Sequence, residues 1–192
     1  MFDPLLRPVK ERVIYPLARL VGKRISPIIL TIAGMLLGLG AAFAVALNAL
    51  GVALALWLVS RLFDGLDGVV ARRQGTQSDF GGYVDLLLDS VVYAAVPLAL
   101  ALRADSVAAY VATLVLLGVF YVNIVSWTVL STILEKRRAE EARRGAQAQG
   151  TAAPNGGHAE APRMTTITMP SGIIEGSETL AFYTLFLIFP GA

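Results

Sequence analysis

The stretch DGLDGVVARRQGTQSDFGGYVDLLLD, residues 64–89, places four aspartates between two strongly apolar parts of the chain. The uncharged run before it follows a turn near Ala49 and ends at Ser60. That run is well short of the ~20 residues that a helix needs to cross a bilayer. A helix that crosses here must therefore include Asp64 and Asp67.

The same length argument applies to the apolar run on the other side of the stretch. A crossing that ends near Leu102 must begin around Gly81, so it includes Asp85 and Asp89. Two consecutive membrane helices, each carrying an acidic pair and joined by a short loop, are therefore predicted.

The composition of the whole chain also indicates a membrane protein. Hydrophobic residues make up 56% of the 192 residues, which is more than an ordinary soluble domain carries. Basic residues cluster beside apolar runs and the net charge is only +2, which suits anionic lipid head groups better than nucleic acid. Cysteine is absent, which excludes disulfides and thiolate metal sites and leaves carboxylates as the obvious metal ligands.

We expect an all-α, polytopic transmembrane helical bundle. The charge pattern of residues 1–24 is typical of an interfacial amphipathic helix, and residues 25–192 would form the transmembrane domain. Besides the two acidic helices, this domain is predicted to contain spans at about 27–47, 107–134 and 172–189, and a flexible cytoplasmic loop at 135–165.

The distribution of Lys and Arg predicts one orientation of these five spans. The N-terminal segment, Arg72 with Arg73, and residues 136–144 are rich in positive charge, which places them in the cytoplasm. An odd number of spans would leave the C terminus on the other side, immediately after an apolar run. We therefore expect a sixth, C-terminal span to be missing from this chain.

The spacing of the four acids indicates a metal site. Asp64 and Asp67 are three residues apart and Asp85 and Asp89 are four apart, so each pair projects from one face of its helix. Four like charges near a bilayer are too costly unless cations neutralise them. Oxygen ligands favour Mg²⁺, Mn²⁺ or Ca²⁺, and a pair of such ions can stabilise the attacking and leaving oxygens of phosphoryl transfer.

Other residues of the stretch suit a phosphate-bearing substrate. Gly68 and Gly81 would let backbone or ligand approach closely, and Arg72 can donate two hydrogen bonds to a phosphate. Asp89 lies deepest in its predicted span, so it is the best candidate to take a proton from an incoming hydroxyl. Taken singly, Arg72 fits a cytoplasmic anchor and the glycines fit helix packing, so the joint spacing carries the prediction.

The pattern Asp64-x2-Asp67-Gly68-x2-Ala71-Arg72-x8-Gly81-x3-Asp85-x3-Asp89 resembles the complete signature of the CDP-alcohol phosphatidyltransferase family. The resemblance implies a fold of six transmembrane helices in the inner (cytoplasmic) membrane, usually a homodimer. It also implies an enzyme of phospholipid biosynthesis whose active site faces the cytoplasm. Its reaction would transfer a phosphatidyl group from CDP-diacylglycerol to a small alcohol and release CMP.

The resemblance further implies roles for individual residues. Two Mg²⁺ or Mn²⁺ ions would be bound, one by Asp64, Asp67 and Asp85 and the other by Asp64, Asp85 and Asp89, and Asp89 would also be the catalytic proton acceptor. The residues implied to bind the CDP-lipid are Gly68, Arg72, Ser78, Gly81 and Thr31.

Two questions stay open at this point. The acceptor alcohol is not fixed, and glycerol 3-phosphate, inositol phosphate and serine are all candidates. Glu175 and Glu178 could share a helix face and bind the acceptor, although acids favoured at a helix start explain them equally well. The alternative function is a divalent-cation transporter, because intramembrane carboxylates also line cation pathways.

Overall fold

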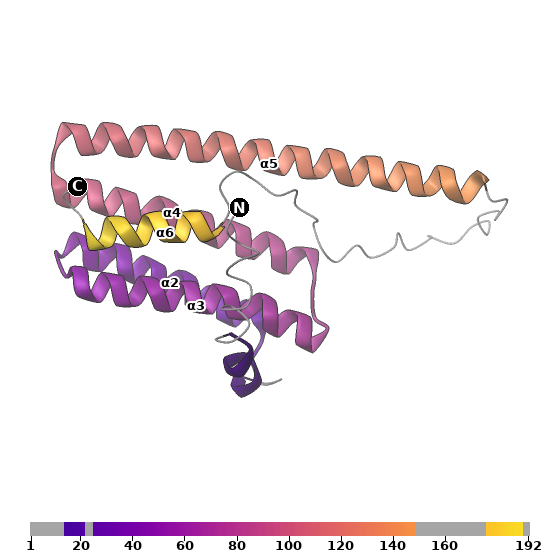
Figure 1. Cartoon of the computed structure of the whole chain (residues 1–192), viewed down its shortest axis with the longest axis horizontal. Coiled ribbons are helices and arrows are strands. Elements are labelled where there is room, and N and C mark those ends of the chain that lie inside the picture. The colour runs from indigo at the N-terminus through magenta and orange to yellow at the C-terminus, as the bar shows by residue number, and fades with distance from the viewer. Residues whose placement is uncertain (1–13, 22–24, 149–175, 190–192) are drawn as a thin grey trace. The chain divides into compact units, whose positions relative to one another are not determined.

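The computed structural model describes residues 14–21, 25–148 and 176–189, and these residues form helices and short connections without a strand. The all-α prediction is confirmed. The chain divides into two compact units, one made of residues 1–117 and 171–192 and the other of residues 118–170. The helices are a short one at residues 14–21, α2 (Pro27–Ala46), α3 (Leu50–Gln74), α4 (Asp79–Ala104), α5 (Val107–Ala148) and α6 (Gly176–Ile188) (Figure 1).

The two acidic helices extend as the length argument predicts. α3 runs through Asp64 and Asp67 and ends at Gln74, where Gly75 takes the left-handed conformation with φ 65° that favours glycine after a helix. α4 begins after Ser78, whose side chain accepts a hydrogen bond from the backbone N–H of Gly81 and so caps the helix. The connection between the two helices is therefore short.

Several helices have the length and apolar character of membrane spans. Among the described residues, α2, α4 and α5 are long and apolar enough to cross a bilayer. α3 has 25 residues, which is enough to cross, but it carries the charged residues that the length argument places there. The exposed surface is rich in large apolar side chains, as expected for helices that face lipid. The chain is a helical membrane bundle.

The described part of the predicted fifth span is shorter than expected. α6 has 13 residues, and a helix of that length is only ~20 Å long, less than the ~30 Å hydrocarbon core of a bilayer. Residues 172–175 of the predicted span lie outside the described residues, as do residues 1–13 and 22–24 of the predicted amphipathic segment.

The predicted start of the flexible loop at residue 135 is wrong, because α5 continues to Ala148. The segment 135–148 consists almost entirely of strong helix formers, namely Ala, Glu, Lys, Arg and Gln. It also has opposite charges four residues apart, as in Lys136 with Glu140 and Arg137 with Glu141, a spacing that supports a helix in water. Residues 149–165 of the predicted loop lie outside the described residues.

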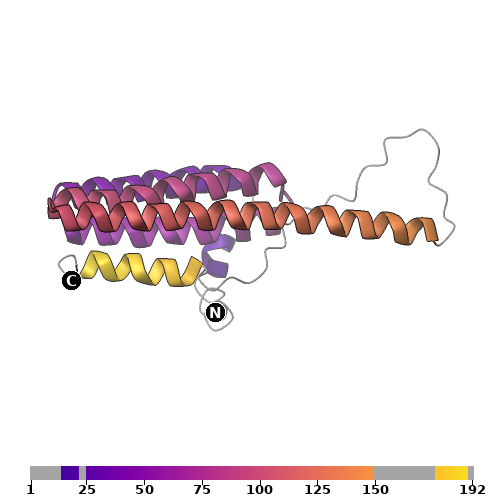
Figure 2. The ribbon, with the colours of Figure 1, turned by 90° about the horizontal axis from the view of Figure 1, so that it is seen from above.

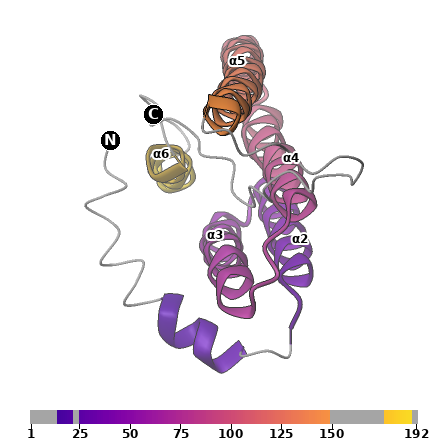
Figure 3. The same cartoon turned by 90° about the vertical axis from the view of Figure 1, so that its right-hand side faces the viewer.

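α2 packs against both acidic helices, and Figure 3, which looks along the helix axes, shows it beside α3 and α4. The backbones of α3 and α4 approach α2 much more closely than they approach each other. The buried face of α2 is made mainly of Gly and Ala, which lets the neighbouring backbones come near. α3 and α4 therefore meet mainly through long side chains.

α6 packs on α3 and runs along the α2–α4 group in Figure 2. The rings of Tyr183 on α6 and Trp57 on α3 stack with centroids 5.5 Å apart. Trp57 Nε1 donates a hydrogen bond of 3.1 Å to Thr184 Oγ1. The Tyr183 hydroxyl donates one of 2.8 Å to the backbone carbonyl of Tyr93 on α4. α6 thus braces both acidic helices.

Gly38 is the tightest point of the α2 packing. A Cβ atom added there would lie 2.5 Å and 2.8 Å from the two Cγ atoms of Val92 and 3.1 Å from Ser60 Oγ. We expect Gly38→Ala to lower the free energy of unfolding by about 1–3 kcal/mol, because Val92 is β-branched and cannot easily move aside. Gly51→Ala is the control, since a Cβ at Gly51 meets nothing within 4 Å. Thermal unfolding in detergent compares the variants, and equal stability of Gly38→Ala and Gly51→Ala would contradict the packing.

Candidate functional site

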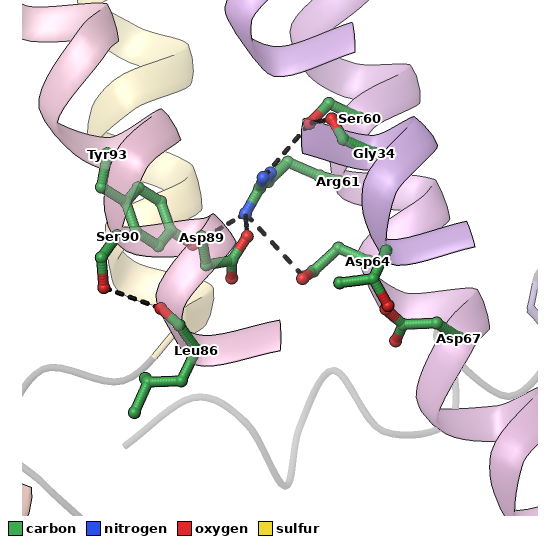
Figure 4. A network of polar contacts seen from close by, with 10 residues as sticks. Gly34, Ser60, Arg61, Asp64, Asp67, Leu86, Asp89, Ser90 and Tyr93 are labelled. Atoms are coloured by element: carbon green, nitrogen blue, oxygen red, sulfur yellow. Dashed lines mark hydrogen bonds and ion pairs between the residues drawn. The ribbon is translucent and has the colours of Figure 1, made fainter. Parts of the chain in front are cut away.

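The site lies where α3 and α4 face each other with their charged side chains. Arg61 and Asp64 project from α3 toward Asp89 and Tyr93 of α4 (Figure 4). Each helix contributes residues three or four positions apart, which is the spacing that puts side chains on one helical face. The four side chains therefore meet between the two helices.

Arg61 is the centre of the polar contacts. Its Nη1 atom donates a hydrogen bond of 2.9 Å to Asp89 Oδ1 and one of 3.1 Å to the Tyr93 hydroxyl, and it lies 3.9 Å from Asp64 Oδ2. Its Nη2 atom donates to Ser60 Oγ at 3.1 Å. The guanidinium thus lies between one acid of α3 and one acid of α4.

Aromatic rings enclose the same guanidinium. The Arg61 Cζ atom is 4.9 Å from the centroid of the Trp57 ring and 5.1 Å from that of the Tyr93 ring, within the range of cation–π attraction. The Trp57 and Tyr93 rings meet edge to face with centroids 6.2 Å apart. Tyr183 contacts both rings. The charged site therefore has an aromatic base that α6 helps to build.

Asp67 has a different partner, on α2. The Thr31 hydroxyl lies 2.6 Å from Asp67 Oδ2 and 3.1 Å from the Pro27 carbonyl oxygen. One hydroxyl proton serves one acceptor at a time, and the shorter, charge-assisted contact to the carboxylate is the stronger. The family resemblance implies that Thr31 binds the CDP-lipid, and in this structure its hydroxyl bonds to Asp67.

The four predicted acids share one electrostatic environment. Asp64 interacts with both Asp85 and Asp89, Asp67 interacts with Asp64 and Asp89, and Asp85 interacts with Asp67 and Asp89. The structure thus brings the two pairs into one region between α3 and α4. Like charges gathered in one region repel, so positive charge there is favourable.

The donor chemistry of this region fits a hard divalent cation. Its candidate ligands are carboxylate oxygens, and Asp85 Oδ1 is buried without a hydrogen-bond partner, which leaves an acceptor that a cation would satisfy. As the side chains lie, however, no three acidic or histidine side chains of the described residues form a group arranged to hold a metal ion. Arg61 bonds to one oxygen of Asp89 and Thr31 bonds to one oxygen of Asp67, so these two carboxylates would bind an ion through their other oxygen.

The remaining predicted residues lie around the α3–α4 connection. Ser78 and Gly81 form the N-terminal cap of α4, and a Cβ at Gly81 would lie 3.2 Å from Ser78 Oγ. A Cβ at Gly68 would lie 3.4 Å from Arg72 Nη1, so the exposed Arg72 side chain extends over the bare backbone of Gly68. Glu175 and the side chain of Glu178 lie outside the described residues.

Arg61 and its aromatic neighbours belong to the site but are not among the residues predicted from the sequence. A signal was present, because Arg61 precedes Asp64 by three residues and so shares its helical face. An arginine inside a predicted span is also costly unless it has an acidic partner. Trp57 and Tyr93 carried no comparable signal, since aromatic residues in membrane helices most often face lipid or pack.

The fold and the site together define a helical membrane protein with a cluster of buried and half-buried carboxylates shared by two of its helices. The model of the CDP-alcohol phosphatidyltransferase family matches residues 24–172, and the chain belongs to this family. The match includes α2, α3 and α4 and therefore all four acids.

Three relatives match parts of the chain. It is 38% identical over 105 residues to the inner membrane protein YnjF of Escherichia coli, covering 54% of this chain and 50% of YnjF. It is 37% identical over 86 residues to an uncharacterized protein of Aquifex aeolicus, covering 44% and 43%. It is 35% identical over 86 residues to the bifunctional IPC transferase and DIPP synthase of Thermococcus kodakarensis, covering 45% and 20%. The matches thus span half or less of each relative, and no solved structure matches the chain.

The contact between Thr31 and Asp67 gives a testable expectation. Thr31→Val removes the donor from a buried carboxylate, so we expect the free energy of unfolding to fall by about 1–3 kcal/mol. Thr31→Ser keeps the hydroxyl and is the matched control. Thermal unfolding in detergent with EDTA measures both variants. If Thr31→Val and Thr31→Ser were equally stable, the hydrogen bond to Asp67 would have no part in holding the site.

Proposed function

We propose that this protein transfers a phosphatidyl group from CDP-diacylglycerol to an alcohol acceptor and releases CMP. The observation that carries the proposal is the convergence of the acids at 64–67 and 85–89 between α3 and α4, in a chain of the CDP-alcohol phosphatidyltransferase family. The relative named as a bifunctional IPC transferase and DIPP synthase also supports a transferase activity.

In the proposed reaction, the acceptor oxygen attacks the lipid-linked phosphorus of CDP-diacylglycerol. A new phosphorus–oxygen bond forms, the bond to the CMP oxygen breaks, and Asp89 takes the proton of the acceptor hydroxyl. Arg72 donates hydrogen bonds to phosphate oxygens, and the bare backbone at Gly68 lets the nucleotide approach.

Asp64, Asp67, Asp85 and Asp89 would hold two Mg²⁺ or Mn²⁺ ions. When bound, such ions stabilise the negative charge of the pyrophosphate and of the leaving CMP. Thr31 then has an indirect role in this proposal, because it fixes the orientation of Asp67.

We further propose that the site lies at the cytoplasmic face of the inner membrane. The α3–α4 connection follows Arg72 and Arg73 and is exposed, as expected at a cytoplasmic end. A site at this depth suits a substrate whose acyl chains stay in the bilayer while its nucleotide and the acceptor come from water. We also propose that the protein forms a homodimer and that Glu175 and Glu178 contact the acceptor.

A divalent-cation transporter is less well supported. A pathway across the bilayer needs polar groups along its length. The buried or half-buried acids of α3 and α4 are confined to positions 64–67 and 85–89, and the other acid of α4, Asp79, is exposed in its first turn. This distribution is better suited to holding an anionic substrate at one end of the helices.

The proposed role of Asp89 predicts a large loss of activity on substitution. We expect Asp89→Asn to reduce CMP release by about 10²–10⁴-fold, because the general base is lost. Asp105→Asn, at the far end of α4, is the control and should leave the rate unchanged. The assay supplies CDP-diacylglycerol, Mg²⁺ and glycerol 3-phosphate, inositol phosphate or serine, and follows CMP and lipid products by mass spectrometry. Absence of CMP from folded wild-type protein with every acceptor would rule out the proposed function.

Metal dependence is a separate expectation. Removal of divalent ions with EDTA should abolish CMP release, and added Mg²⁺ or Mn²⁺ should restore it, because Arg61 and Arg72 alone cannot offset the negative charge of four carboxylates and a pyrophosphate. A Ca²⁺ addition of equal concentration tests whether small, hard ions are preferred. Full turnover in EDTA would show that the acids do not act through a metal.

A further inference from the structure

Arg61 is a charged residue of the site that the proposed reaction does not use. It lies outside the signature at residues 64–89. The Arg61 side chain is only 4% exposed, whereas those of Asp64 and Asp89 are 31% and 25% exposed. Burial of a cation this deep is strongly unfavourable unless acids pair with it. Arg61 therefore approaches the acids from the buried side, and the open side of the acids remains for a substrate.

The contacts of Arg61 fix its position on three helices. One terminal nitrogen bonds to Asp89 and Tyr93 on α4. The other bonds to Ser60, whose hydroxyl donates a hydrogen bond of 2.8 Å to the Gly34 carbonyl on α2. A planar guanidinium can make all of these bonds together, and a single ammonium group cannot.

The aromatic base keeps the guanidinium from turning away. The Trp57 and Tyr93 rings both lie within 5.1 Å of its central carbon. Trp57 is itself held by Thr184 of α6, and the Tyr183 hydroxyl bonds to the backbone of Tyr93. A side chain bounded by two rings and bonded at both terminal nitrogens is a rigid support.

We propose that Arg61 is the positioning residue of the active site: it holds Asp89 from the buried side and offsets part of the repulsion between Asp89 and Asp64. Arg61 bonds to Oδ1 of Asp89. This bond keeps the partly exposed Asp89 side chain in the orientation from which it meets an acceptor hydroxyl. The inference rests on the proposed function in that Asp89 is taken as the proton acceptor.

Kinetics give the first test, with Arg61→Gln and Arg61→Lys compared to Arg103→Gln. Arg103 lies near the far end of α4 and bonds to Asn48, so its substitution should leave the rate unchanged. Because a small misplacement of a reacting group is costly, we expect Arg61→Gln to lower kcat by about 100-fold with little change in KM for CDP-diacylglycerol. Arg61→Lys should recover only part of this loss. An unchanged kcat, or a loss confined to KM, would overturn the inference.

The second test needs no turnover. In EDTA, the melting temperature is measured for wild type, Arg61→Gln, Asp89→Asn and the double variant. If Arg61 holds Asp89, Arg61→Gln should lower the melting temperature by several degrees in the wild type and by clearly less in the Asp89→Asn background. Additive effects would mean that the two residues are independent and would contradict the proposal.

Three further outcomes are decisive. If Arg61→Gln and Arg61→Lys do not fold, Tyr93→Phe removes one Arg61 contact without changing charge, and it should lower kcat several-fold at unchanged KM; full activity of Tyr93→Phe would then overturn the inference. If the wild type releases no CMP while the melting temperatures are non-additive, the proposed function fails, but Arg61 still holds Asp89. If the wild type is active and the effects are additive, only the role of Arg61 fails.

Discussion

The cost of burying several carboxylates close together is the constraint on which this structure depends. Their side chains are at most partly exposed between α3 and α4, so water stabilises their charges incompletely and partners supplied by the protein or by a bound ion matter. Arg61 supplies a fixed positive charge to Asp89 and lies near Asp64, and Thr31 supplies a hydroxyl to Asp67. Asp85 keeps a buried oxygen without such a partner. The pairing is therefore unequal: Asp89 and Asp67 have hydrogen-bond partners, Asp64 lies near a positive charge, and one oxygen of Asp85 has no protein partner.

The packing of α2 creates the space in which these partners fit. Its Gly and Ala face draws α3 and α4 toward it, while the backbones of α3 and α4 stay farther from each other. Long side chains bridge that interval, and a smaller pair of residues could not reach across it. The tight contact of Gly38 with Val92 sets where α4 lies and so helps to set where Asp89 lies. The packing of α2 against α3 and α4 thus determines the geometry of the site.

The sequence predicts the features of the structure that depend on helix length and residue spacing. It does not predict contacts between residues that are distant in the chain. The bilayer thickness requires α3 and α4 to include their acids, and helical periodicity turns each pair to one face. Both expectations depend on local rules alone. The bond of Thr31 to Asp67 joins residues 36 positions apart and has no local signal. The extension of α5 to Ala148 was missed because a polar, Ala-rich composition was interpreted as loop, although its charge spacing also favours a helix.

The network of contacts around the acids is therefore larger than the signature at residues 64–89. On α3 it starts at Trp57, on α4 it continues to Tyr93, and through Tyr183 and Thr184 it includes α6. Because Arg61 brings positive charge from inside the protein, the acids can be assembled during folding before any ion binds, and repulsion among them need not be relieved by metal alone. If the proposed divalent ions bind, they would meet carboxylates already held near one another, and less of their binding free energy would be spent on ordering these side chains. Arg61 thus supports the acids from their buried side. Because it lies on that side, it leaves their open side accessible to a substrate.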